Sequence, residues 1–240
     1  MVTGGGTGLG AEVSRQLLQE GASVAMSYHP GGHLDGVRTL AEEFGASARS
    51  YGVNLSRGAE VEAFFDQASS DLGGIDLLVN NAGVWPTGSF SEITADDWDM
   101  TFAVNCRAPF LLCQRMIRQT QSEWTRKIVN ITSQAAFHGS TTGHAHYAAS
   151  KAALVTMTIS LAREIAGGNV TANCVALGMM DSNMVRDSFH EKKDYYLSRI
   201  PVGRIAEPSD IAPVVLFLLS QDSNYMTGTT VDVTGGMLMR

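Results

Sequence analysis

The sequence predicts an α/β protein in which one parallel β-sheet is covered by helices on both faces. Segments that favour strands alternate with segments that favour helices along all 240 residues, which is the pattern of successive βα units. Residues 75–79 (IDLLV) form an almost continuous apolar run, as expected for a strand that is buried on both faces. No linker, repeat or low-complexity segment divides the chain, so we expect residues 1–240 to form a single domain.

The expected elements follow one another in a regular order. A glycine-rich turn at residues 3–10 opens a helix whose apolar positions Val13, Leu17 and Leu18 share one face. Only two residues precede this turn. The first strand is therefore either unusually short or begins upstream, and we expect a structural consequence at this central strand. The other strands are expected at residues 22–27, 47–53, 75–79, 127–131, 171–176 and 230–233, and the other helices at residues 34–44, 58–71, 95–119, 209–220 and around Tyr147.

The composition argues against several classes of partner. The formal net charge of −7 disfavours nucleic acid and anionic membranes as main partners. No apolar run approaches the roughly 18 residues needed to span a bilayer, and no export signal is visible, so a cytoplasmic location is expected. The three cysteines, Cys106, Cys113 and Cys174, lack metal-ligand spacing. They are interpreted as reduced thiols, and no metal is expected.

The glycine-rich turn at residues 3–10 (TGGGTGLG) is a candidate dinucleotide-binding loop. Glycines let the backbone approach a pyrophosphate closely, and the N-terminus of the following helix offers free N–H groups and the positive end of a dipole. The spacing matches the common Gly-x-Gly-x-x-Gly fingerprint only in part. The strand expected at residues 22–27 lies about where a βαβ unit would have it, which strengthens the interpretation.

Tyr147 and Lys151 form a candidate acid–base pair. They lie four residues apart in an Ala- and Leu-rich segment that is typical of a helix, and residues four apart share one helix face. A free tyrosine has a pKa of about 10, and a neighbouring ammonium group favours the phenolate and lowers that pKa. The pair can therefore provide a general acid–base near neutral pH. The alternative interpretation is an ordinary surface pair.

Several motifs occur together in the order and approximate spacing of the short-chain dehydrogenase/reductase family. They are the glycine-rich turn, Asn80-Asn81-Ala82-Gly83, Asn105, Ser133, Tyr147, Lys151 and the tail at residues 201–236. The chain resembles this family over essentially its whole length, and its tail resembles the 3-oxoacyl-(acyl-carrier-protein) reductase branch. The resemblance implies a Rossmann-type, doubly wound parallel sheet, a dinucleotide-binding catalytic domain, a nicotinamide cofactor and a homotetramer or homodimer.

The resemblance also implies roles for four candidate catalytic residues. Tyr147 would give a proton to a carbonyl oxygen during reduction, or take one from an alcohol during oxidation. Lys151 would lower the pKa of Tyr147 and bind the nicotinamide ribose. Ser133 would hold the substrate oxygen as an oxyanion-hole donor does. Asn105 would kink its helix and order a water that connects Lys151 to solvent.

The cofactor site implied by the resemblance is extended along the chain. It comprises Gly4, Gly6, Thr7, Gly8, Leu9, Gly10, Tyr28, His29, Asn54, Leu55, Asn81, Ala82, Gly83, Tyr147, Lys151, Gly178, Met180 and Ser182. Asn54 stands where the family usually has an adenine-contacting aspartate. Leu177 stands where relatives have proline beside the nicotinamide, and Ser182 still offers a hydroxyl to the carboxamide.

The choice of cofactor depends on the end of the strand at residues 22–27. An acidic residue there would bind the ribose 2′-hydroxyl of NAD and repel the 2′-phosphate of NADP. Tyr28 and His29 occupy this position instead, so NADP (NADPH) is favoured and NAD stays an alternative. Thr7 moderates this preference, because many NADP-using relatives carry a basic residue at its position.

The substrate pocket is expected to be mainly apolar. The residues expected to face it are Trp85, Ala135, Phe137, His138, His144, Met179, Met180 and the segment 184–197. Residues 183–199 mix charged and aromatic side chains and are interpreted as a substrate lid. Arg126, Lys127 and Arg163 are candidate docking residues for an acidic carrier protein.

The resulting hypothesis is an NADPH-dependent reduction of a ketone to a secondary alcohol, with Tyr147 as general acid. The ketone is either a 3-oxoacyl thioester or another apolar carbonyl compound. One alternative is the NAD-dependent oxidation of a secondary alcohol. Another is a non-catalytic regulator that senses a dinucleotide, although such a protein is expected to lack Tyr147 or Lys151.

Overall fold

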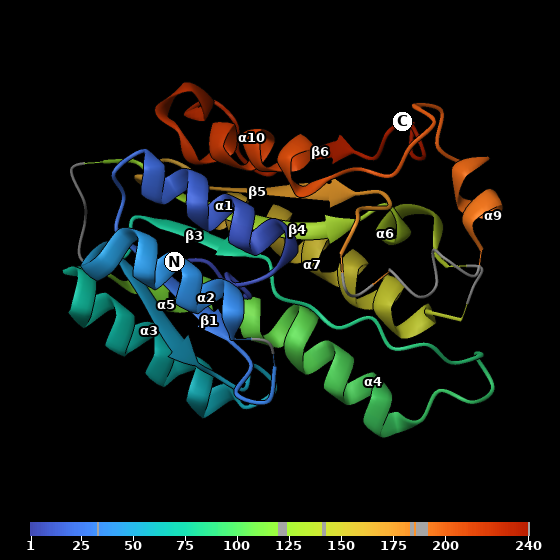
Figure 1. Ribbon diagram of the computed structural model, residues 1–240, viewed down its shortest axis with the longest axis horizontal. Helices are drawn as coiled ribbons and strands as arrows, with labels where there is room; N and C mark the ends of the chain where they lie inside the picture. Colours follow the sequence, from blue (N-terminus) through green and yellow to red (C-terminus); the bar gives the residue numbers. More distant parts are fainter. Residues whose placement is uncertain (33, 120–123, 141–142, 183–184, 186–191, 240) are drawn as a thin grey trace.

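The computed structural model describes residues 1–32, 34–119, 124–140, 143–182, 185 and 192–239. Its strands form a parallel sheet with the spatial order β2-β1 and β3-β4-β5-β6 (Figure 1). The strands are β1 (Val24–Tyr28), β2 (Ala48–Gly52), β3 (Leu77–Asn80), β4 (Arg126–Ser133), β5 (Val170–Leu177) and β6 (Thr230–Val233). Strands β4 and β5 are rich in β-branched residues and favour a pleated, buried surface.

Val2 joins the two groups of strands into one sheet. It forms parallel bridges to Met26 on one side and to Val79 on the other. The Val2 N–H donates to the Ala25 carbonyl at 2.8 Å, and the Thr3 N–H donates to the Val79 carbonyl at 3.0 Å. The short first segment expected from the sequence therefore takes the central position of the sheet with a single bridged residue.

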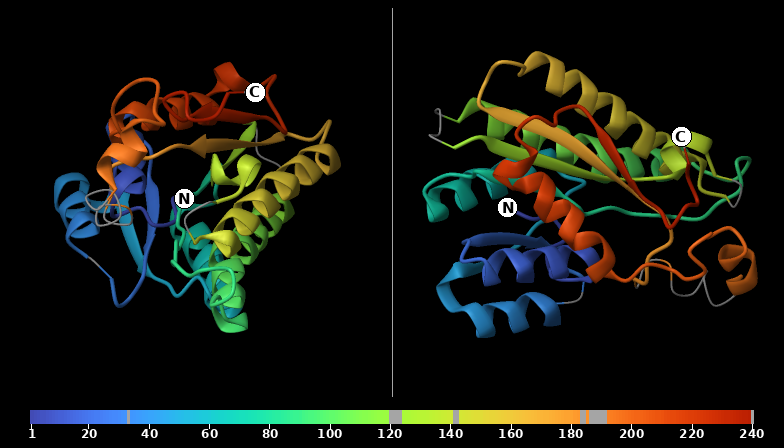
Figure 2. Two further views of the ribbon diagram at one scale, coloured as in Figure 1. Left: turned by 90° about the vertical axis from the view of Figure 1, so that its right-hand side faces the viewer. Right: turned by 90° about the horizontal axis from the view of Figure 1, so that it is seen from above.

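Helices cover both faces of this sheet (Figures 1 and 2). One apolar core packs α1 (Gly8–Gln19), α2 (Asp35–Phe44) and α10 (Pro208–Leu219) against the strands. A second core on the opposite face contains α3 (Gly58–Leu72) and α5 (Ala108–Arg118), with α7 (Ala145–Glu164) on the same side. The single-domain α/β fold with helices on both faces, expected from the sequence, is confirmed.

Shorter elements complete the described chain. They are α4 (Ala95–Phe102), α6 (Ala135–His138), α9 (Lys193–Leu197) and the 3₁₀ turns Gly45–Ser47 and Gln221–Ser223. Within the described residues, no helix is long and apolar enough to cross a membrane. In the expected lid at 183–199, residues 183, 184 and 186–191 lie outside the described residues.

The single helix expected at residues 95–119 is interrupted around Asn105, the residue for which the family resemblance implied a kink. A π-helical segment, Ala103–Arg107, separates α4 from α5. Its centre is Asn105, which is fully buried and bonds with its side chain to the backbone of a neighbouring loop. Helix propensity along the sequence does not register such a tertiary bond, which accounts for the difference.

Candidate active site

The glycine-rich turn is shaped by close backbone contacts. Gly4 has a φ of +63° and Gly8 a φ of +50°, a region that favours glycine. A Cβ on Gly10 would lie 2.1 Å from the Gly4 carbonyl oxygen. A Cβ on Gly36, in the first turn of α2, would lie 1.8 Å from the Gly6 carbonyl oxygen. Two helices therefore close on this turn at positions where only glycine fits.

Asn81 connects the glycine-rich turn to the end of β3. Its Nδ2 donates to the Thr3 carbonyl at 2.9 Å, while the Thr3 hydroxyl accepts from the backbone N–H groups of Asn81 and Ala82, each at 3.0 Å. These bonds fix the position of the glycine-rich turn relative to the Asn81-Ala82-Gly83 segment. Both border the same cleft.

The carboxyl ends of the strands open into a cleft of about 660 Å³. Of the expected cofactor residues, the cleft is lined by Gly4, Gly6, Thr7, Gly8, Leu9, Tyr28, His29, Asn54, Leu55, Asn81, Ala82, Gly83, Tyr147, Lys151, Met180 and Ser182. Gly10 and Gly178 do not line it. Gly10 instead provides the close approach to Gly4 described above. Gly178 lines the adjacent, smaller pocket.

Sequence reasoning missed several residues of this cleft. They are Ser27, Gly32, Val53, Ser56, Val84, Met100, Val104, Ile131 and Thr132, whereas Leu177, which was expected beside the nicotinamide, does line the cleft. Most of them end a strand or begin the following loop. The rule that ligands of open α/β sheets bind outside the carboxyl ends of strands would have identified these positions. Met100 and Val104 belong to the α4 region and had no comparable signal.

At the carboxyl end of β4, three of the expected catalytic residues lie close together: Ser133, Tyr147 and Lys151. Ser133 is the last residue of this strand, and the other two lie one turn apart on α7. The Lys151 Nζ lies 5.8 Å from the centroid of the Tyr147 ring and donates to the Ile131 carbonyl at 2.8 Å. The Thr132 hydroxyl donates to the Lys151 carbonyl at 3.0 Å, which fixes this turn of α7 against β4.

Burial governs the protonation of the pair. It lowers the pKa of the Lys151 ammonium group to about 8, because removal of water disfavours the charged form. Burial also raises the pKa of Tyr147, and a hydrogen bond with the Ser133 side chain counteracts part of this rise. The expectation that Lys151 brings the pKa of Tyr147 below its ordinary value is therefore wrong for this structure, since desolvation dominates.

Asn105 links the π-helical segment to the active-site helix. Its Oδ1 accepts from the Val84 N–H at 2.8 Å, and its Nδ2 donates to the Val84 carbonyl at 3.0 Å and to the Ser150 hydroxyl at 3.1 Å. A Cβ on Gly83 would meet Asn105 Oδ1 at 3.2 Å and Lys151 Nζ at 3.4 Å. Asn105 and Lys151 therefore both pack against Gly83, although Asn105 lines neither the cleft nor the smaller pocket.

The smaller pocket, of about 100 Å³, adjoins the cleft at Tyr147, which lines both. Its walls are Trp85, Ser133, Gln134, Ala135, His138, Gly139, Ser140, His144, Tyr147, Gly178, Met179, Val185, Tyr195, Tyr196, Arg199 and Met237. Of the expected substrate-facing residues, Phe137 does not line this pocket and Met180 lines the cleft instead. We name this space the substrate pocket.

An aromatic stack forms one wall of the substrate pocket. The rings of Trp85 and His144 are stacked with centroids 4.0 Å apart, and the Trp85 ring meets Tyr147 edge-on at 6.4 Å. The His144 Nδ1 lies 3.0 Å from the Pro86 carbonyl oxygen. A carbonyl only accepts, so Nδ1 carries the proton. Burial lowers the pKa of His144, so its neutral form is favoured.

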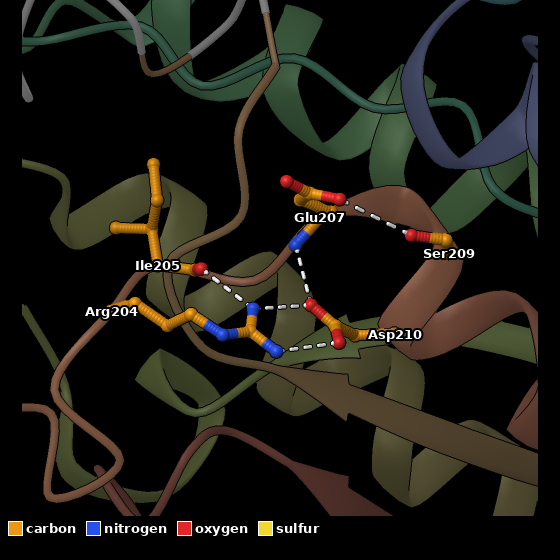
Figure 3. A network of polar contacts seen from close by, with 5 residues as sticks. All are labelled: Arg204, Ile205, Glu207, Ser209 and Asp210. Carbon is orange, nitrogen blue, oxygen red and sulfur yellow. Dashed lines mark hydrogen bonds and ion pairs between the residues drawn. The ribbon is translucent and has the colours of Figure 1, made fainter.

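A network of polar contacts lies at the start of α10 and just before it (Figure 3). Arg204 binds Asp210 through two nitrogens, at 2.6 and 2.7 Å, and this pairing lowers the pKa of Asp210 to about 2. Asp210 also accepts from the Glu207 N–H at 2.8 Å. The adjoining Ala206 pairs with Met180 through a parallel bridge. The network therefore adjoins a segment that pairs with a cleft-lining residue.

Two of the three expected carrier-protein docking residues are buried. The Arg126 side chain donates to the Met116 carbonyl at 2.7 Å, at the end of α5. The Lys127 Nζ donates to Asn224 Oδ1 at 2.6 Å. The two residues are 4% and 0% exposed, respectively. The expectation that they form a docking patch is therefore wrong, because β4 is buried along its whole length.

Comparison with known proteins identifies the family. The family model described as Enoyl-(Acyl carrier protein) reductase matches residues 4–238. Nodulation protein G of Rhizobium meliloti is 36% identical over 239 residues, which cover 100% of this chain and 96% of that protein. The 3-oxoacyl-(acyl-carrier-protein) reductase of Staphylococcus epidermidis is 34% identical over 242 residues, which cover 100% of this chain and 98% of that protein.

A solved structure agrees with the sequence comparisons. The crystal structure of a blue fluorescent protein from a metagenomic library, in complex with NADPH, matches with a TM-score of 0.92 and 34% identity, covering 99% of this chain and 96% of that one. The chain belongs to the short-chain dehydrogenase/reductase family. It is an oxidoreductase of this class and resembles its 3-oxoacyl-(acyl-carrier-protein) reductase branch.

Proposed function

We propose that this protein reduces a ketone to a secondary alcohol with NADPH. The observation that carries this proposal is the position of Tyr147, which lines both the cofactor cleft and the substrate pocket and is hydrogen-bonded to Ser133. A general acid that lies between the cofactor cleft and the substrate pocket can protonate the carbonyl oxygen of a ketone whose carbon receives the hydride. Both Tyr147 and Lys151 are retained, which disfavours the non-catalytic regulator.

The proposed reaction needs one hydride and one proton. The nicotinamide supplies the hydride to the carbonyl carbon when the cofactor is bound. The Ser133 hydroxyl donates a hydrogen bond to the carbonyl oxygen and stabilises the charge that develops on it. Tyr147 then gives its phenolic proton to this oxygen, and the Lys151 ammonium group stabilises the phenolate that remains. Asn105 acts as a positioning residue for α7.

The NADPH preference rests on the end of β1. Tyr28 and His29 line the cleft there, and neither carries the negative charge that would repel a 2′-phosphate. The NADPH complex of the blue fluorescent protein, a full-length structural match, supports the same cofactor. NAD-linked oxidation of a secondary alcohol is the second candidate, because Thr7 adds no positive charge to attract that phosphate.

A free ketone is a better-supported substrate than a carrier-bound thioester. The reductase of Staphylococcus epidermidis acts, by its name, on a 3-oxoacyl group held by a carrier protein. In this chain, however, Arg126 and Lys127 are buried and are not available to an acidic carrier. The substrate pocket of about 100 Å³ also suits a small molecule.

We also propose that the protein is a homotetramer. Trp98, Phe110 and Ile117 on α4 and α5 are 40%, 46% and 36% exposed, and an exposed apolar surface marks a site of association. Sedimentation velocity should give four times the mass of one chain. The substitution Phe110→Glu should reduce that mass, whereas a wild-type monomer would contradict the proposal. A cytoplasmic location stays a prediction.

The first experiment is a fluorescence titration of the purified protein with NADPH and NADH. We expect tighter binding of NADPH, followed by oxidation of NADPH in the presence of small ketones. A preference for NADH would favour the alcohol dehydrogenase. Binding of neither dinucleotide would overturn the proposed function.

A further inference from the structure

The substrate pocket contains a permanent positive charge. Arg199, two residues after α9, lines the pocket together with Ser133 and Tyr147. No aspartate or glutamate belongs to the described lining. A guanidinium group stays protonated under all ordinary conditions. The described walls therefore combine a cation with the hydroxyl groups of the proposed chemistry and have no opposing charge.

Arg199 is oriented by an aromatic side chain. Its guanidinium carbon lies 5.2 Å from the centroid of the Tyr195 ring, and its Nη1 donates to the Tyr195 hydroxyl. Such stacking leaves further N–H groups of the planar fork for an external acceptor. Among the ion pairs of the described residues, none joins Arg199 to a carboxylate. The guanidinium is thus oriented by Tyr195, with no carboxylate partner among the residues that the structure describes.

A second cation lies near the same pocket. Burial is the main cause of the lowered pKa of His144, and the charge of Lys192 contributes only a minor part; His144 is a wall residue of the pocket. Asp194 is on the same helix, α9, but does not line the pocket. Arg199 therefore gives the described wall of the pocket a positive charge, and Lys192 adds a second charge from outside the lining, in contrast to a uniformly apolar pocket.

We propose that the ketone substrate carries a carboxylate and that Arg199 binds this carboxylate as a specificity-determining residue. The inference rests on the proposed function and narrows its substrate class. Arginine and carboxylate match in geometry through two parallel hydrogen bonds. The pocket has a volume of only about 100 Å³, so the carboxylate belongs to the same small molecule as the carbonyl carbon. Lys192 adds a weaker, longer-range attraction.

The test compares acids with their esters. The probes are 3-oxobutanoate and 4-oxopentanoate, each with its methyl ester, assayed with NADPH. The wild-type enzyme should prefer the better acid over its ester by about tenfold or more in kcat/KM, because hydrogen bonds to charged groups contribute that much. Arg199→Gln should remove this preference, mainly by raising the KM for the acid. Arg199→Lys should restore part of it, and Lys193→Gln is the control.

A binding measurement separates this inference from the proposed function. Calorimetric titration of 4-oxopentanoate and 3-oxobutanoate into the enzyme–NADP⁺ complex needs no turnover. Suppose that the wild-type enzyme binds one of the acids, that Arg199→Gln abolishes this binding, and that no probe is reduced. This result would support the anion site and overturn the proposed reductase activity. Reduction of the esters at the same rate as the acids, or equal losses for both in Arg199→Gln, would overturn the anion site alone. Neither binding of an acid nor reduction of any probe would overturn both.

Discussion

Asn105 pairs with both backbone polar groups of Val84, accepting from its N–H at 2.8 Å and donating to its carbonyl at 3.0 Å. The bonded residue lies in the loop after β3, and the third Asn105 bond reaches Ser150 on α7. One fully buried amide thus ties the π-helical segment to a cleft-lining loop and to the helix of Tyr147.

Asn105→Leu should therefore lower both stability and turnover. It leaves the polar groups of Val84 without their partner, and we expect a loss of about 2–4 kcal/mol in the free energy of unfolding. Urea denaturation monitored by circular dichroism measures this loss. Cys106→Ala, on the same π-helical segment, is the control and should cost clearly less. Equal effects of the two substitutions would argue against the role of the Asn105 bonds.

Tyr147→Phe should reduce kcat by about 10³-fold, because it removes the proposed general acid and little else. The ring of Tyr147 packs edge-on against Trp85, and phenylalanine preserves this contact. Cofactor affinity, measured by fluorescence, should stay within about threefold of wild type, well below the 1.4 kcal/mol of a tenfold change. Substantial remaining turnover would exclude Tyr147 as the acid.

Ketone reduction should slow as the pH rises through about 8. The pKa of Lys151 is lowered from 10.5 to about 8 by burial, so its positive charge is present below this pH and is lost above it, earlier than in the unfolded chain. Tyr147 does not compete in this range, because its pKa is raised and it keeps its proton. A plot of kcat/KM from about pH 6 to about pH 10 measures the transition. A profile that stays flat through pH 8 would contradict the assignment.

Gly36→Ala should distort the glycine-rich turn, although Gly36 itself belongs to α2 and not to the turn. The new Cβ would lie 1.8 Å from the Gly6 carbonyl oxygen, so the backbone has to move, at a cost of about 2 kcal/mol or more in stability. NADPH affinity should fall with it. Gly58→Ala is the matched control in the first turn of α3, where the nearest atom is the Leu111 Cδ1 at 3.3 Å. This control should be neutral or stabilising by up to about 1 kcal/mol.

Tyr28→Asp should reverse the cofactor preference. A carboxylate at the end of β1 repels the 2′-phosphate of NADP and binds the 2′-hydroxyl of NAD. We expect NADPH affinity to fall by about tenfold or more, since like charges cost several kcal/mol at close range. Asparagine has nearly the same size as aspartate but no charge, so Tyr28→Asn should change the ratio of NADPH affinity to NADH affinity far less. Parallel fluorescence titrations of both variants measure this ratio.

Much of the fold and most of the cleft could be predicted from local sequence signals. The alternation of strands and helices located the six strands and anticipated the short central segment at Val2. The helical spacing of Tyr147 and Lys151 predicted that the two side chains share one helix face. Gly36, in contrast, carries no motif; its meaning arises only when α2 packs on the glycine-rich turn. The direction of the Tyr147 pKa shift depends on burial, which the spacing of two residues does not reveal. Lys127 looks like a surface residue from its sequence, but it lies in the fully buried strand β4, where Asn224, distant in the sequence, accepts a hydrogen bond from its Nζ.

The bridges of Val2 have a consequence for the order of folding. The amino group of Met1 bonds to a carbonyl 76 positions away, so the centre of the sheet closes only after a long loop of chain has been ordered. Closure of such non-local pairs is slow. The glycine-rich turn directly follows the central segment at Val2, and its shape depends on the earlier formation of β1 and β3. Dinucleotide binding should therefore appear late in refolding, after most of the helical circular dichroism signal has returned. The fluorescence of the bound dinucleotide would then report the final step of folding.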